Sequence, residues 1–465
     1  MWLRQDRRHA LAALLVASIM AAAGDAVAQS AKQEDPIPAT PKQDLTAIQR
    51  TFTLQTPPPL TVFPELREQW KNTPAFLRDS KFDINFRSYY RDEVTNAPNS
   101  VGIKEAWAAG GSASLETGRL FDILSLGAVL YTSFPIVAPP DYGNTGLLLP
   151  NQQGYAVFGQ LYGRARLFET HYATVGRYYY DTPFLGPHDN RMTPNTFFGY
   201  TLTGTIGSTE NGGPSFRYGG GWIGAIKPRD AIDFQSMGSK AGAPNSNAGV
   251  GVLGGTLTWG PASIGAVEYY SEDILNIFYT EGKYGVSFGG GFSAFGAAQF
   301  VAQNSTGQAL LNGGNYFATN QFGAKVDLGY QTGILTVGYS TVNPSFAIQT
   351  PWSANPFYTD AQIQAFQRPG EQALMIGASY VFTPIGLPGV AASVFYFNGW
   401  TSAPAAGAPL VETEWDFNLE WRPNWKPLQG LWLRARYGTS SVWQSNTRTN
   451  IDEVRLILNY NVKLY

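Results

Sequence analysis

The sequence contains no cysteine, only three histidines, and few charged residues for its length. Lys, Arg, Asp and Glu make up 14% of the 465 residues, whereas about a quarter is usual in globular domains. The absence of cysteine excludes disulfides and cysteine-ligated metal sites. The formal net charge of −2 gives no basic footprint for nucleic acid, so we expect no nucleic-acid partner.

Long apolar runs are equally scarce. A bundle of membrane-spanning helices needs several apolar stretches of about 20 residues, and the sequence has only one long apolar run, the 15 residues 10–24. Arginines precede this run, and residues 26–28 (Ala-Val-Ala) end it with the pattern of a cleavage site. These features predict a secretory signal peptide over residues 1–28. The alternative, a single anchoring helix, is disfavoured because the run is short and ends in small residues.

Proline, threonine and glutamine dominate the next part of the chain. Residues 29–75 include the run Pro57-Pro58-Pro59 and no apolar pattern that could build a core. We predict a Pro-rich periplasmic extension over this range.

From residue 76 onward, the sequence consists of segments of about ten residues with alternating polarity, separated by turn-forming residues. The clearest segment sets Trp415, Phe417, Leu419 and Trp421 against Glu414, Asp416, Asn418 and Glu420. Aromatics reach 14% of the chain, and no linker divides the last 390 residues or so, as it would in a soluble all-β protein of this size. The pattern predicts an all-β fold, a transmembrane antiparallel β-barrel over residues 76–465. At about 20 to 24 residues per strand with its loops, it would have about 16 to 20 strands and an aqueous lumen.

Several segments resemble the OprD-type family of substrate-specific outer-membrane porins. They occur in family order, and they are Phe76-Leu77-Arg78-Asp79-Ser80-Lys81, Thr145-Gly146-Leu147-Leu148-Leu149-Pro150, Arg191-Met192-Thr193-Pro194-Asn195, Asn320-Gln321-Phe322-Gly323-Ala324-Lys325, Phe366-Gln367-Arg368-Pro369-Gly370-Glu371 and Glu453-Val454-Arg455-Leu456-Ile457-Leu458. The resemblance implies an 18-stranded barrel in the Gram-negative outer membrane, with an inward-folded third extracellular loop. It also implies a narrow pore for small solutes that usually carry a carboxylate.

The family resemblance further implies a ladder of basic residues on the barrel wall. Alternation places seven basic side chains on the lumen face: Arg87, Arg164, Arg166, Lys325, Arg434, Arg436 and Arg455. These are candidates for binding a passing carboxylate, because a guanidinium can donate two parallel hydrogen bonds to it. The alternative for each is pairing with a neighbouring acid on the wall. Arg164 and Arg166 rank first because no acid lies beside them in their own segment.

The family order places the inward loop at residues 181–197. Its prolines would stiffen it, and its polar candidates for the constriction are Asp181, His188, Asp189 and Arg191. Arg191 could select the solute or fasten the loop to the wall.

No enzyme motif is present. The two histidines beyond the signal peptide have no partner at ligand spacing, and no nucleophile elbow or phosphate loop occurs. We therefore expect a non-enzymatic channel for passive, substrate-selective uptake, without cofactor or metal. The alternatives are a general diffusion porin and, as a minor one, an outer-membrane barrel enzyme. Expected partners are outer-membrane lipids, the barrel assembly machinery and a small anionic solute, with the chain as a homotrimer or a monomer.

Overall fold

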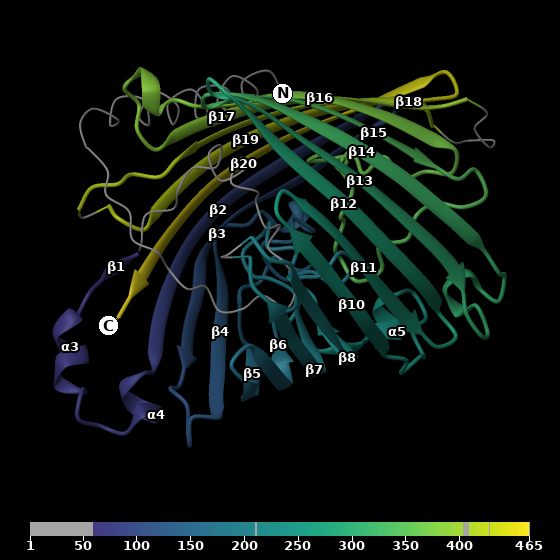
Figure 1. Ribbon diagram of the computed structural model, residues 1–465. Helices are drawn as coiled ribbons and strands as arrows, with labels where there is room; N and C mark the ends of the chain where they lie inside the picture. Colours follow the sequence, from purple (N-terminus) through teal and green to yellow (C-terminus); the bar gives the residue numbers. More distant parts are fainter. Residues whose placement is uncertain (1–58, 210–211, 403–408, 427, 465) are drawn as a thin grey trace.

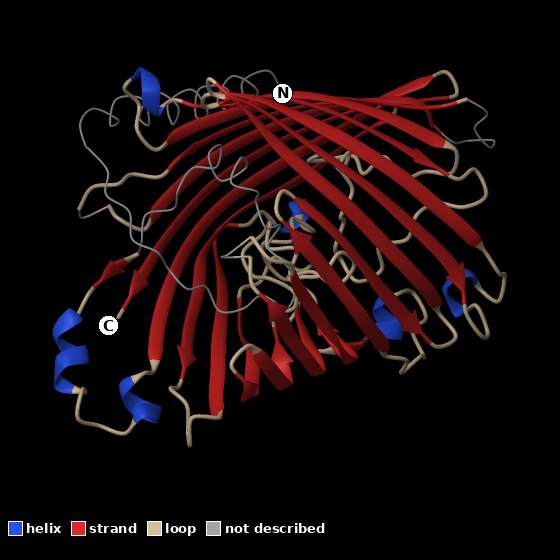
Figure 2. Cartoon of the chain, in the orientation of Figure 1, coloured by secondary structure: helices blue, strands red, loops and turns tan. Residues whose placement is uncertain are grey.

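The computed structural model describes residues 59–209, 212–402, 409–426 and 428–464 (Figure 1). Strands dominate this part of the chain, and Figure 2 shows the loops gathered in the space that the strands enclose. Within it, no helix is both long and apolar enough to cross a membrane. The predicted signal peptide and residues 29–58 of the predicted extension lie outside the described residues.

Eighteen long strands form one closed antiparallel barrel. They are β2 (Lys81–Ala97), β3 (Ser100–Glu116), β4 (Leu124–Val137), β5 (Tyr155–Phe168), β6 (His171–Tyr178), β7 (Thr196–Gly207), β8 (Ser215–Lys227), β10 (Val250–Trp259), β11 (Ala262–Ser271), β12 (Leu275–Gly289), β13 (Phe292–Ser305), β14 (Ala318–Tyr330), β15 (Gly333–Val342), β16 (Glu371–Val381), β17 (Val390–Thr401), β18 (Pro409–Trp421), β19 (Leu431–Gln444) and β20 (Thr447–Lys463). Each strand pairs with the next long strand along the chain, and β20 pairs with β2 to close the barrel. The predicted architecture is confirmed.

Side chains alternate between the outside of the barrel and its lumen, as the pleat of a strand requires. On β18, Trp415 and Phe417 are exposed on the outer face, whereas Glu414 is fully buried on the lumen side. On β2, Phe86 is exposed on the outer face, and its neighbour Arg87 bonds to a loop inside the barrel. Charged residues are therefore collected on the inner wall.

The connections differ in length between the two ends of the barrel. Turns at the end where β2 begins and β20 ends are short, such as residues 290–291. The longest connections lie at the other end, and four of them contribute to the interior: residues 138–154, 179–195, 228–249 and 343–370. Short helical segments occur among the connections: α5 (Met237–Lys240) and the 3₁₀ helices Pro140–Tyr142, Leu310–Asn312 and Thr383–Ile385.

The long loops pack on one another inside the barrel. Trp352 of loop 343–370 is fully buried, and its indole Nε1 donates to the carbonyl of Met237 at 3.1 Å. Leu185 of loop 179–195 pairs with Ser353 in a β-bridge, and Phe184 is buried in the same apolar cluster. Loop 179–195 joins the fifth and sixth barrel strands, β6 and β7, so the predicted inward fold of this loop is confirmed.

The described residues before the barrel attach to its short-turn rim. Strand β1 (Leu60–Thr61) pairs in parallel with the last residues of β20, and the helices α3 (Pro64–Gln69) and α4 (Ala75–Arg78) follow it (Figure 1, lower left). The end of the predicted extension is thus hydrogen-bonded to the barrel. The predicted division of the chain at residue 75 stays a prediction.

Candidate functional site

Three arginines lie side by side on the lumen wall. Arg91 of β2 is directly opposite Arg455 of β20, and Arg455 is directly opposite Arg436 of β19. Side chains in such positions have Cβ atoms about 5 Å apart, and like charges there repel. The strand register thus builds a band of positive charge, which we call the arginine row.

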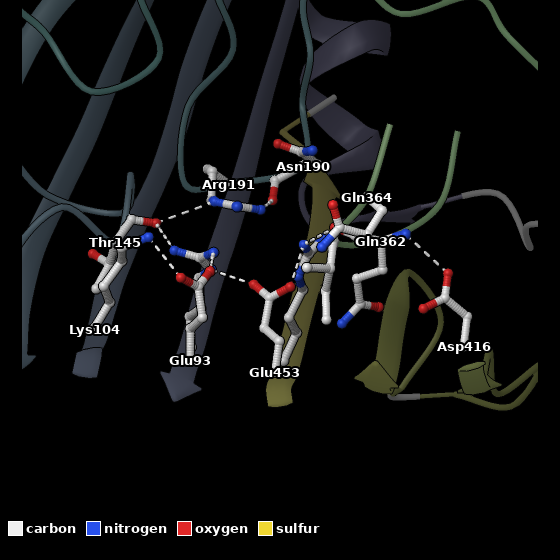
Figure 3. Close-up of polar contacts among 12 residues, drawn as sticks. Glu93, Lys104, Thr145, Asn190, Arg191, Gln362, Gln364, Asp416 and Glu453 are labelled. Carbon is white, nitrogen blue, oxygen red and sulfur yellow. Dashed lines mark hydrogen bonds and ion pairs between the residues drawn. The ribbon is translucent and has the colours of Figure 1, made fainter. Parts of the chain in front are cut away.

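Two carboxylates balance part of this charge (Figure 3). Glu453, which is 1% exposed, accepts hydrogen bonds from Arg91 Nε and, at 2.6 Å, from Arg455 Nη2. Glu93 lies opposite Glu453 and accepts from Arg91 Nη2 and from Lys104 Nζ. Glu453 therefore bridges two of the three arginines in the row.

Arg436, the third member of the row, has no carboxylate hydrogen-bonded to it within the described residues, and its Nε is buried without a hydrogen-bond partner. Arg434, two residues earlier on the same face, donates from Nε to the Asn418 amide oxygen and lies 5.7 Å from the centre of the Trp432 ring. Strand β19 thus presents two guanidiniums whose charge no directly bonded acid cancels.

Arg191 adds a further guanidinium from loop 179–195 (Figure 3). Its Nε donates to the Thr145 carbonyl at 3.2 Å, and its Nη1 donates to the Asn190 carbonyl at 2.9 Å. Arg91 Nη1 donates to the same Thr145 carbonyl at 3.0 Å. Burial, together with the positive charges of Arg455 and Arg91, lowers the pKa of Arg191 well below its usual range, although a guanidinium remains protonated in proteins. Arg191 therefore adds a third guanidinium beside Arg91 and Arg455.

Loop 343–370 is fastened to the wall beside the arginine row. The backbone N–H groups of Ile363 and Gln364 each donate at 2.7 Å to the buried carboxylate of Glu414. The N–H of Gln362 donates at 2.9 Å to Asp416, and its carbonyl accepts from Arg455 Nη2 at 2.9 Å (Figure 3). Two wall acids therefore act as anchors for the loop backbone.

A second anchor, on strand β2, holds loop 179–195. Arg87 of β2 forms an ion pair with Asp189 at 2.5 Å, and it also donates to the carbonyl of Arg191. Tyr89, two residues along, donates from its hydroxyl to the carbonyl of Asn190 at 3.0 Å. The loop tip is thus bonded to consecutive lumen positions of one strand.

A cavity of 520 Å³ lies between the two inward loops and strands β10 to β12. Its charged lining is mostly acidic and consists of Asp181, Asp189, Glu281, Asp360 and Lys283, with His188 beside them. Glu281 pairs with Lys283 at 2.7 Å. The lumen therefore has a basic wall on β2, β20 and β19 and a more acidic compartment under the loops.

The remaining predicted ladder members lie apart from the row. Lys325 of β14 pairs with Asp327 at 3.1 Å. Arg164 lies near the short-turn end of β5, where its guanidinium is 4.3 Å from the centre of the Tyr172 ring. Arg166, two residues further on, donates to the Asp122 carbonyl in a turn at 3.3 Å. Their predicted role in selecting a solute stays a prediction, as does that of the other candidates.

Sequence reasoning did not select Arg91, which the structure places at the centre of the charge network. Arg91 is four residues after Arg87 and so shares its face of the strand. This alternation could have identified Arg91 as a lumen-facing residue. Its position opposite Arg455 depends on the register between β2 and β20, which the alternation does not give. Among the described residues, no group of three acids or histidines is placed to hold a metal ion.

Known proteins share the architecture of this chain. The family model for outer membrane porins of the OprD family matches residues 74–464. Comparison with curated protein sequences found no match. The fold is similar to that of Pseudomonas aeruginosa OccK9 (OpdG), with a TM-score of 0.73 and 22% identity over 84% of this chain and 100% of the other. It is also similar to P. aeruginosa OpdK with vanillate (TM-score 0.69, 19% identity, 83% and 100%) and to a BenF-like porin from Pseudomonas fluorescens Pf-5 (0.72, 20%, 84% and 100%). The chain belongs to the OprD family of outer-membrane porins.

Proposed function

We propose that this outer-membrane porin admits small organic anions that carry a carboxylate, by passive diffusion through the lumen. Such a channel performs no chemistry and needs no cofactor. The observation that carries the proposal is the excess of guanidinium over carboxylate at the arginine row. Arg91, Arg455, Arg436 and Arg191 lie together there, and Glu93 and Glu453 are the acids hydrogen-bonded to any of them among the described residues.

An anion entering a constriction loses part of its hydration and needs replacement contacts. Arg434 and Arg436 can supply them, because neither is bonded to an acid among the described residues. The planar fork of a guanidinium offers two parallel N–H groups to a carboxylate. Arg455 and Lys325 are weaker candidates for binding the anion, because each already forms an ion pair with an acid on the barrel wall.

The inward loops would set the upper size of the solute. Loop 179–195 is fastened to β2, and loop 343–370 is fastened to β18 and β20, so both narrow the same lumen. The OpdK structure was solved with vanillate, an aromatic carboxylate, and this supports the chemical class proposed here. Aromatic acids and amino acids are therefore the first solutes to test.

Planar-bilayer recording tests the proposal. In a salt gradient, the purified protein should show a reversal potential that favours anions, and millimolar benzoate should reduce the salt current. The double variant Arg434→Gln/Arg436→Gln should lose both effects. The matched control Arg119→Gln removes one positive charge at an exposed turn between β3 and β4 and should retain both. If benzoate does not change the salt current through the unmodified protein, the result favours the alternative, a general diffusion porin.

A further inference from the structure

Arg87 is a predicted ladder residue, yet its donors are largely engaged within the protein. Nε donates to the Asn459 amide oxygen at 2.6 Å, and Nη1 donates to Asp189 and to the Arg191 carbonyl. Nη2 donates to the second oxygen of Asp189 at 3.2 Å. Because a guanidinium has five N–H donors in a fixed fork, a passing carboxylate could bind Arg87 well only by displacing Asp189.

The two partners differ in exposure. The Arg87 side chain is 12% exposed, whereas the Asp189 side chain is 37% exposed and lines the cavity under the loops. The Asp189 carboxylate therefore contacts Arg87 on the barrel wall and is also exposed toward the open lumen.

The surroundings of the pair fix its geometry. Asn459 lies directly opposite Arg87 on β20 and accepts from Nε, so the guanidinium plane is held on the wall side. The Tyr89 hydroxyl bonds the next loop carbonyl, at Asn190. A bidentate arginine–carboxylate contact fixes the relative orientation of the two groups as well as stabilising them. Here it orients the tip of loop 179–195 toward β2.

We propose that Arg87 is a positioning residue rather than a solute contact: it holds the tip of loop 179–195 against β2 through Asp189 and cancels the charge of Asp189 at the edge of the passage. This assignment goes beyond the proposed function, because it holds for whichever solute passes. Its test contains no organic solute, so its failure is distinguishable from failure of the carboxylate proposal.

Single-channel recording in potassium chloride tests the assignment. Arg87→Gln and Asp189→Asn should each raise the population of displaced loop states about fivefold, the effect of losing roughly one strong contact, and this appears as added current noise. The two variants should shift the reversal potential in opposite directions. Arg87→Gln uncovers a carboxylate and favours cations, whereas Asp189→Asn uncovers a guanidinium and favours anions.

The charge exchange Arg87→Glu/Asp189→Arg separates positioning from simple loss of a lumen charge. It should return the noise toward that of the unmodified protein, because the pair is restored with its polarity reversed. Arg78→Gln is the matched control, since it breaks an exposed Arg–Asp pair in helix α4 and should leave both noise and selectivity unchanged. Quiet channels in Arg87→Gln, or an exchange variant as noisy as both single variants, would overturn the proposal.

A chemical measurement keeps the test independent of electrical noise. The chain has no cysteine, so His188→Cys introduces a single thiol beside the pair, on the cavity lining. Its reaction with a water-soluble thiol reagent should be about fivefold faster when Arg87→Gln is added, for the same population reason. An equal rate in the two backgrounds, with both proteins folded by circular dichroism, contradicts a positioning role.

Discussion

Arg91 lies directly opposite Arg455, and the single carboxylate of Glu453 accepts a hydrogen bond from each. Two buried like charges in that register would repel, so Glu453 is the group that makes the arrangement stable. Among the described residues, no acid is hydrogen-bonded to Arg436, the third arginine of the row. If the proposed function holds, neighbouring residues on one wall divide two roles, the structural pairing of charges and the attraction of the solute.

Replacing Glu453 with Gln should destabilise the barrel strongly. The substitution leaves two buried guanidiniums without their shared anion, and removing one member of a buried ion pair costs about 3–5 kcal/mol. Chemical unfolding in detergent micelles measures the change in the free energy of unfolding. Glu68→Gln breaks the exposed pair with Lys71 and should leave that free energy unchanged within error. Equal stability of the two variants would show that Glu453 is dispensable.

Replacing Glu414 with Gln should release loop 343–370. The Glu414 side chain accepts backbone N–H groups from Ile363 and Gln364, and leaving a buried donor without its acceptor costs about 1–3 kcal/mol. A glutamine keeps one acceptor oxygen and turns an amide donor toward the other N–H. The expected result is faster cleavage within the loop by added protease. Glu420→Gln is the control, because Glu420 bonds Arg422 and Trp432 instead, and it should be cut at the normal rate.

Replacing Trp352 with Ala should both destabilise the loop packing and widen the passage. The ring is fully buried between loops 343–370 and 228–249, and such truncations cost about 3–5 kcal/mol. Single-channel conductance should rise while thermal stability falls. Trp352→Phe retains most of the ring and loses only the bond to the Met237 carbonyl, so its conductance should stay close to normal. Unchanged conductance in the alanine variant would mean that this ring does not support the constriction.

Acidification should loosen loop 179–195 at His188. Burial, followed by the charges of Arg229 and Arg191, lowers the pKa of His188 to about 3 in the folded protein, from 6.5. A histidine with a lowered folded pKa stabilises the fold fully above its unfolded pKa, and that contribution is lost as the pH falls below 6.5 toward 3. Current noise should therefore increase over this range and stay constant between pH 7 and 8. His188→Gln should weaken the dependence of current noise on pH. An identical pH profile in this variant would show that other groups cause the dependence.

The strand pattern was largely predictable from the sequence. Outer-face residues such as Trp415 and Phe417 alternate with inner-face residues such as Glu414, and the structure confirms that assignment. A two-residue period in a chain with a charged and an apolar face leaves one inward orientation for each strand. The inward loop was predictable only through the family resemblance, because no periodicity marks it.

The partners of the lumen charges were not predictable in the same way. Asp189 is 102 residues from Arg87 in sequence, and Glu453 is 362 residues from Arg91. Alternation states which face a side chain occupies, but the pairing between strands and the path of the loops decide which charge it meets. For that reason alternation did not single out Arg91, and it placed Arg87, which pairs with Asp189, in the same set of candidates as Arg434 and Arg436.

By itself, the sequence determined the barrel, its approximate strand number and the concentration of charge on the inner wall. Those features follow from local alternation and from the absence of long apolar runs, which are properties of neighbouring residues. Only the tertiary structure decided that Arg91, Arg455 and Arg436 stand in one row, and that the row meets loops from distant parts of the chain. Electrostatic interactions act over a few ångströms in space, so the division between paired and available charges is set where strands and loops meet.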